Sequence, residues 1–151
     1  MNTKKIIRIA LCASLLIGVQ LAFSGISGIE LVTLLLLSFS FSLGHREGVA
    51  IATVFSILRC LIFGFYINIV VLYIVYYNLF ALFFGWLGKR FSYTLSFKKT
   101  VVVIIFSVLF TALFTLADDI ITPLIFGFSK TATIAYFFAS LYTLIPQAIC
   151  T

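Results

Sequence analysis

Eight polar or aromatic side chains that could hold a ligand lie within stretches that are otherwise apolar. They are Glu30, Arg59, Asn68, Tyr73, Tyr77, Asn78, Asp118 and Asp119. A charged group surrounded by apolar material is unfavourable unless it is paired, so we expect Arg59 to pair with one of the three acids in this set. Such a pair either fixes the register of neighbouring helices or takes part in binding a ligand, and the sequence leaves both interpretations open.

The two consecutive acids are expected to differ in their surroundings. Successive residues of a helix point about 100° apart, so only one of Asp118 and Asp119 is expected to face the interior of a bundle. The other is then an interfacial residue in contact with water.

Two tyrosines lie four residues apart on one helical face. Tyr73 and Tyr77 share that face with Phe80 and Phe84. Such a stripe is usual in packing or in an interfacial belt. The functional alternative is an aromatic wall that stacks a flat organic ligand.

Two amides could orient such a ligand. Asn78 falls near the middle of its apolar stretch, whereas Asn68 falls near the start. A lone amide in an apolar environment needs a partner, so Asn78 is the stronger candidate of the two.

Other kinds of site lack their residues. Cys12, Cys60 and Cys150 have no second Cys or His at ligand spacing, and His45 is the only histidine. The motifs of nucleotide, metallopeptidase and serine-hydrolase sites do not occur. We therefore expect no catalytic residue, no bound metal, no cofactor and no disulfide framework.

The elements that carry these residues are membrane helices. The chain has 151 residues, of which 64% are hydrophobic and 9% are charged, too few polar residues to coat a soluble globule. This excludes a water-soluble enzyme. The sequence predicts one all-α membrane domain over 1–151, a bundle of six transmembrane helices near 6–23, 29–43, 49–66, 67–87, 101–121 and 131–151. The second is the shortest and rises only about 22 Å.

The basic residues orient this bundle. Those that precede the first helix or lie between the second and third or the fourth and fifth are Lys4, Lys5, Arg8, Arg46, Lys89, Arg90, Lys98 and Lys99. The positive-inside rule then places both termini in the cytoplasm and the candidate ligand-binding residues in the outer half of the membrane. Because the basic residues on the cytoplasmic side of the helices account for most of the net charge of +6, we expect no nucleic-acid partner.

The first helix carries a stripe of small residues at every fourth position. The stripe consists of Ala10, Ser14, Gly18 and Ala22, and it would allow another helix to approach closely. That helix belongs either to the same bundle or to a partner. A second interpretation of this segment is a secretory signal cleaved near the Ala22-Phe23-Ser24 stretch.

The chain resembles the substrate-binding S component of an energy-coupling factor (ECF) transporter. The resemblance is carried by the small-residue stripe, by GIELVTLL at 28–35, GHREG at 44–48, LIFGF at 61–65, and the anchor Lys89-Arg90. It extends over essentially the whole chain. The family usually has Ala at both small positions where this chain has Ala10 and Ser14, and a serine still permits close approach.

The resemblance implies a six-helix subunit of a prokaryotic plasma membrane. It would capture a vitamin or related micronutrient from outside and would not hydrolyse ATP. Small residues of the first helix, here Ala10, Ser14, Gly18 and Ala22, would dock it on a transmembrane coupling protein that carries two cytoplasmic ATPases. The lipid bilayer is its other partner, and the subunit is expected to topple within it to release the ligand.

Two other classes remain as alternatives. One is a small structural or assembly membrane protein whose polar pairs and aromatic stripes only hold the helices together. The other is a self-sufficient secondary transporter, but 151 residues are few for that class and the halves show no inverted repeat. The ligand is left open, since aromatic and amide side chains suit flavins, pterins, pyrimidines and corrin side chains alike.

Overall fold

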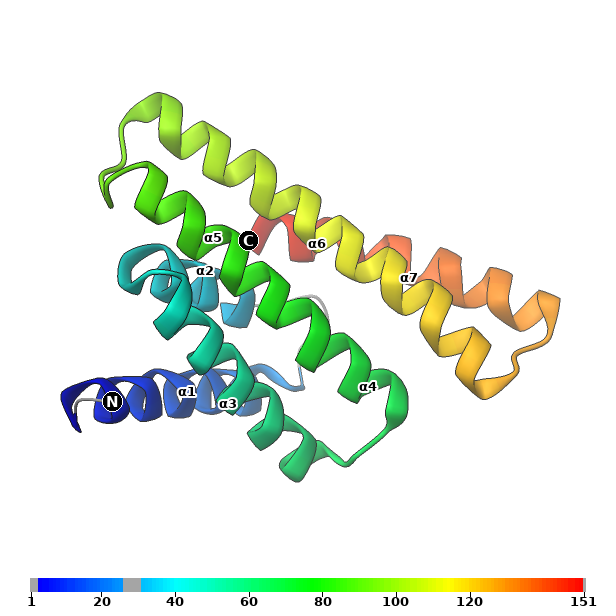
Figure 1. The fold of residues 1–151 in the computed structure, drawn as a ribbon. Coiled ribbons are helices and arrows are strands. Elements are labelled where there is room, and N and C mark those ends of the chain that lie inside the picture. Colours follow the sequence, from blue (N-terminus) through cyan, green and yellow to red (C-terminus); the bar gives the residue numbers. More distant parts are fainter. Residues whose placement is uncertain (1–2, 26–30, 151) are drawn as a thin grey trace.

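The computed structural model describes residues 3–25 and 31–150, and this part of the chain is all-helical, without strands (Figure 1). The elements are α1 (Thr3–Phe23), α2 (Leu31–Leu43), α3 (His45–Phe63), α4 (Ile67–Val71), the π-helical turn η1 (Leu72–Tyr76), α5 (Tyr77–Arg90), α6 (Phe97–Phe126) and α7 (Lys130–Cys150). Since α4, η1 and α5 follow one another without a break, the described residues form six helical rods. The all-α prediction is confirmed.

Four of these rods are long and apolar enough to cross a membrane. Within the described ranges they are Thr3–Phe23, Ile67–Arg90, Phe97–Phe126 and Lys130–Ile149. Helix α2 is apolar but has only 13 residues. Helix α3 has 19 residues and includes Arg46, Glu47 and Arg59. The helices therefore indicate a multi-pass membrane protein.

The turn between α2 and α3 is shorter than the sequence suggests. The third helix begins at His45, not at 49, and Gly44 alone connects it to α2. Gly44 has φ 85°, a left-handed conformation that glycine adopts without steric cost. His45, Arg46 and Glu47 thus form the first turn of α3, where the acid is favoured by the helix dipole.

Helix α6 is longer than predicted. The sequence predicts a helix near 101–121, but α6 continues to Phe126 with Pro123 inside it. A proline lacks the N–H that would bond the carbonyl four residues earlier, so the carbonyl of Asp119 loses that partner. The helix instead ends at Gly127, which has φ 63°. Helix α7 continues through Pro146, in agreement with its predicted range near 131–151.

Helix α5 is the centre of a tightly packed unit with α2 and α3. A Cβ atom at Gly85 would lie 2.4 Å from the Cα of His45, and one at Gly88 would lie 2.2 Å from the carbonyl oxygen of Phe41. The two glycines therefore let the corner between α2 and α3 rest directly on α5. Close backbone packing of this kind drives helix association in membranes.

Helix α6 is joined to α5 through aromatic rings. Phe83 lies 5.0 Å from both Phe106 and Phe110, and Phe80 lies 5.5 Å from Phe110, measured between ring centroids. Helices α6 and α7 then form a hairpin whose closing loop lies far from the amino terminus (Figure 1). Among the described residues of α7, none is fully buried.

The two ends of the bundle differ in charge. Glu47 forms ion pairs with Lys5 at 3.5 Å and with Arg8 at 3.1 Å. These pairs join the start of α1 to the start of α3. Lys5, Arg46 and Lys89 all line one cavity of about 370 Å³. Basic residues from three separate segments therefore gather at one end.

The small-residue stripe of α1 lies on the outside of the bundle. Ala10, Ser14, Gly18 and Ala22 are all exposed. A Cβ atom built on Gly18 would have no atom of another described helix within 4 Å. Within the described residues the stripe is thus not used for internal packing, which was one of the two interpretations of it.

Candidate functional site

A seam of polar side chains runs between α6 and α7. On α6 the residues that form side-chain hydrogen bonds with α7 are Thr115, Asp118 and Asp119. On α7 the polar residues are spaced by four, three and four positions, which places them on one face of the helix: Tyr136, Ser140, Thr143 and Gln147. Polar side chains in a membrane helix face a neighbouring helix because lipid cannot form hydrogen bonds with them.

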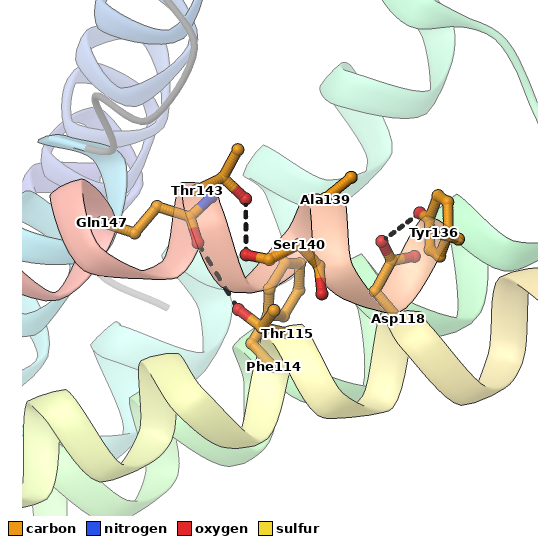
Figure 2. Close-up of a pocket in the computed structure, with 8 residues that line it drawn as sticks. All are labelled: Phe114, Thr115, Asp118, Tyr136, Ala139, Ser140, Thr143 and Gln147. Atoms are coloured by element: carbon orange, nitrogen blue, oxygen red, sulfur yellow. Dashed lines mark hydrogen bonds between the residues drawn. The ribbon is translucent and has the colours of Figure 1, made fainter. Parts of the chain in front are cut away.

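The seam borders an open cavity of about 240 Å³ (Figure 2). Its lining residues are Phe114, Thr115, Asp118, Tyr136, Ala139, Ser140, Thr143 and Gln147. They supply a carboxylate, an amide and several hydroxyl groups, with Phe114 and Ala139 as apolar wall. No basic side chain is among these lining residues, and their hydroxyl and amide groups can both donate and accept hydrogen bonds.

Asp118 is the centre of a hydrogen-bond network that connects three elements. The hydroxyl of Tyr136 donates to its Oδ2 at 2.7 Å, and the hydroxyl of Thr122 donates to its Oδ1 at 2.6 Å. The amide nitrogen of Asn68 donates to the Thr122 hydroxyl at 3.1 Å. Bonds to a charged acceptor are stronger than neutral ones, so this carboxylate holds α4, α6 and α7 together.

Asp119 also bonds to α7, and it is the more buried of the two acids, whereas Asp118 is half-buried. The side chain of Asp119 is 7% exposed, and the hydroxyl of Ser140 donates to its Oδ2 at 2.6 Å. Its Oδ1 is buried without a hydrogen-bond partner. The two acids accept hydrogen bonds from different residues of α7, Asp118 from Tyr136 and Asp119 from Ser140. Asp118 lines the cavity and Asp119 does not.

Arg59 stacks on aromatic rings. Its guanidinium carbon lies 4.2 Å from the ring centroid of Phe63 and 4.4 Å from that of Tyr73. In the described ranges it forms no ion pair, so the expected pairing with Asp118 or Asp119 is absent. Arginine is weakly hydrated and planar, and ring faces can stabilise it in place of a carboxylate. Glu30, the third acid considered, lies outside the described residues.

The tyrosine stripe belongs to the core. Tyr73 and Tyr77 are 8% and 2% exposed, and their ring centroids lie 5.0 Å apart. Both rings contact Phe114, at 6.1 Å and 5.8 Å. The stripe therefore packs inside the bundle and supports one wall of the cavity from behind.

Asn68, and not the stronger candidate Asn78, belongs to the hydrogen-bond network beside the cavity. Asn78 accepts a hydrogen bond from the Thr53 hydroxyl at 2.9 Å and donates to the carbonyl of Ile74, in the π-helical turn, at 2.6 Å. It connects α5 to α3 and does not line the cavity. Asn68 is the amide that joins the network of Asp118.

Replacing Asn78 by Leu should lower stability modestly and leave ligand binding intact. The change removes one bond between helices, and such bonds in membrane proteins contribute about 0.6 kcal/mol on average. Thermal melting in detergent and titration of the bound ligand measure the two effects separately. Loss of affinity without loss of stability would instead place Asn78 in the binding site.

Several residues of the cavity were not singled out from the sequence. The polar ones are Thr115, Tyr136, Ser140, Thr143 and Gln147. The signal that could have found them is the spacing of polar residues along the last helix. Single hydroxyl residues are common in membrane helices, and only their alignment opposite the polar face of α6 distinguishes them.

Comparison with known proteins gives no relationship to report. No protein-family model, no curated protein and no solved structure matches the chain.

Proposed function

We propose that this chain is the membrane-embedded substrate-binding subunit of an ECF-type importer that captures a vitamin or related micronutrient. In this proposal its six helices all cross a prokaryotic plasma membrane and both termini lie in the cytoplasm. The observation that carries the proposal is the polar cavity between α6 and α7. Polar side chains that line a cavity within a membrane are costly to keep unless they are paired or bind a ligand.

The chemistry of the cavity favours a compact ligand with hydrogen-bond donors. The carboxylate of Asp118 and the hydroxyl of Thr115 can accept bonds, and Phe114 offers a ring face. A volume of about 240 Å³ is slightly below the usual range of ligand pockets, so a single ring or one end of a larger molecule suits it.

The distribution of charge supports the proposed orientation. Lys5, Arg46 and Lys89 meet at one end of the bundle, as expected of a cytoplasmic end. Asp118 and Thr122 belong to the opposite half of α6, so the cavity is expected to face the outer side.

The exposed stripe on α1 supports a docking role. Ala10, Ser14, Gly18 and Ala22 present small side chains outside the bundle, where a helix of the coupling protein could approach closely. ATP hydrolysis is assigned to the partner ATPases.

A structural or assembly protein is the second candidate, and one observation favours it. Asp118, Tyr136 and Ser140 already form hydrogen bonds with other side chains, as they would if they only held α6 and α7 together. The two candidates differ in whether the purified chain binds a small molecule saturably.

Substitution of the two acids tests the proposal. We expect the purified chain to bind one member of a panel of flavins, pterins, pyrimidines and corrinoids. Asp118→Asn should weaken that binding about 10- to 100-fold, because hydrogen bonds to a charged group contribute about 1.5 to 3 kcal/mol. Asp119→Asn, the matched control, should leave the affinity nearly unchanged because that residue lies outside the cavity lining.

Equilibrium titration in detergent measures both variants, and melting curves confirm that they are folded. No saturable binding by the wild-type chain would favour the structural candidate. Equal losses in both variants would mean that the acids act through the packing of α7 and not through the cavity.

A further inference from the structure

We propose that the basic end of the bundle holds an anionic phospholipid, with its phosphate near Arg46 and Lys89 and one acyl chain in a groove along α5. This inference does not depend on the proposed transport function. It rests on two adjoining cavities that share one residue, His45.

The first cavity is basic. Its lining residues are Lys5, Leu43, Gly44, His45, Arg46, Glu47, Lys89 and Tyr93. Glu47 is already neutralised by Lys5 and Arg8. In the part of the chain that is described, neither Arg46 nor Lys89 has an ion pair, so the cavity carries unbalanced positive charge.

A strained loop completes this cavity. Ser92 and Tyr93 have φ of 55° and 57°, a left-handed conformation that is unusual for a bulky side chain. The strain places the Tyr93 hydroxyl about 3.2 Å from where a Cβ of Gly44 would lie, at the wall of the cavity. The loop is held by bonds from these two amides to the carbonyls of Lys89 and Gly88. Tyr93 therefore adds a hydroxyl group to the cavity that Arg46 and Lys89 also line.

The second cavity is apolar. It has a volume of about 570 Å³, and its lining residues are His45, Leu79, Leu82, Phe83, Trp86 and Phe110. Leu79, Leu82 and Trp86 are exposed on the surface of the bundle, and they belong to the helical rod Ile67–Arg90, which is long enough to span a membrane. From Leu79 to Trp86 the groove follows α5 for about 10 Å.

The two cavities meet where α3 crosses α5. His45 rests on Gly85, so the groove ends at the residue that also lines the basic cavity. An apolar groove that ends beside a cavity lined by Arg46 and Lys89 suits a molecule with an acyl chain and a phosphate. Basic pockets between membrane helices on the cytoplasmic side are known to bind such headgroups. Free phosphate would leave the groove unfilled.

Trp86 allows a direct test because it is the single tryptophan of the chain and lies in the groove. The wild-type protein is reconstituted in phosphatidylcholine vesicles that contain a small fraction of lipid with brominated acyl chains, which quench tryptophan fluorescence. Brominated phosphatidylglycerol should compete for the groove about fivefold better than brominated phosphatidylcholine. Equal quenching by the two lipids would overturn the proposal.

Variants distinguish a defined site from general surface charge. Combined Arg46→Gln and Lys89→Gln substitutions should remove the preference, whereas Lys98→Gln, an exposed basic residue outside the cavity lining, should retain it. An equal loss in the Lys98 control would overturn the site in favour of diffuse attraction. Inorganic phosphate added at constant ionic strength should leave quenching unchanged, and displacement of the brominated lipid by phosphate would contradict the choice of a phospholipid.

Discussion

Replacing Gly18 by Leu should abolish assembly of the chain with a coupling protein and leave the isolated bundle folded. The reason is that the stripe on α1 faces outward and that no atom of another described helix lies within 4 Å of a Cβ at Gly18. A leucine there would keep a partner helix at a distance without disturbing the bundle itself. The combination with Ala10→Leu should have the same effect.

Affinity co-purification with the coupling protein and ATPases measures assembly, and melting of the isolated chain measures folding. Gly18→Ala is the matched control, because alanine is small enough to allow close packing. If Gly18→Leu instead lowered the melting temperature and ligand affinity together, the stripe would have an internal packing role.

Replacing Gly88 by Ala should strongly destabilise the bundle, whereas the Gly18 substitution should leave it folded. The added Cβ would lie 2.2 Å from the carbonyl oxygen of Phe41, a backbone atom that cannot move unless α2 moves. Overpacking usually costs about 1 to 3 kcal/mol, and we expect the upper part of that range or more. Gly85→Ala should behave similarly, since its Cβ would lie 2.4 Å from the backbone of His45.

Gly18→Ala is the matched control for the effect of Gly88→Ala on stability. An alanine in place of a helical glycine normally stabilises by about 0.5 to 1 kcal/mol, so Gly18→Ala should raise or preserve the melting temperature. Chemical or thermal unfolding in detergent measures the stability of Gly88→Ala, Gly85→Ala and Gly18→Ala. If Gly88→Ala unfolded like the wild type, the close contact between α5 and α2 would be wrong.

The general architecture could be predicted from the sequence because it depends on composition. Apolar stretches separated by basic clusters predict helices in a membrane, and Lys5, Arg46 and Lys89 do gather at one end. Helix ends were less predictable. Helix α6 continues five residues beyond the predicted end at 121 and includes Pro123, because a proline in a membrane helix is tolerated where neighbouring groups compensate for the lost bond.

The candidate site could be predicted only in part. Charged and amide residues were conspicuous, so Asp118 and Asn68 were found, and both belong to the network of the cavity. The hydroxyl residues of α7 were not found because each one alone is ordinary in such a helix. Arg59 was found, but its surroundings of ring faces could not be anticipated from its charge.

The packing of α5 illustrates the same limit. Gly85 and Gly88 are three residues apart, and nothing in this spacing distinguishes them from the exposed Gly18. Whether a small residue serves the bundle or a partner depends on which helix lies opposite. That information is tertiary, so a sequence pattern identifies a close-packing face without identifying what covers it.

Accumulation in proteoliposomes of whichever compound the purified chain binds tests the proposed function most directly. We expect that the chain reconstituted alone accumulates nothing, and that uptake appears only when a coupling protein, both ATPases and ATP are present on the proposed cytoplasmic side. We also expect that Asp118→Asn lowers this uptake while Asp119→Asn does not. Accumulation by the chain alone, or no accumulation by the complete system, would contradict the assignment as a substrate-binding subunit.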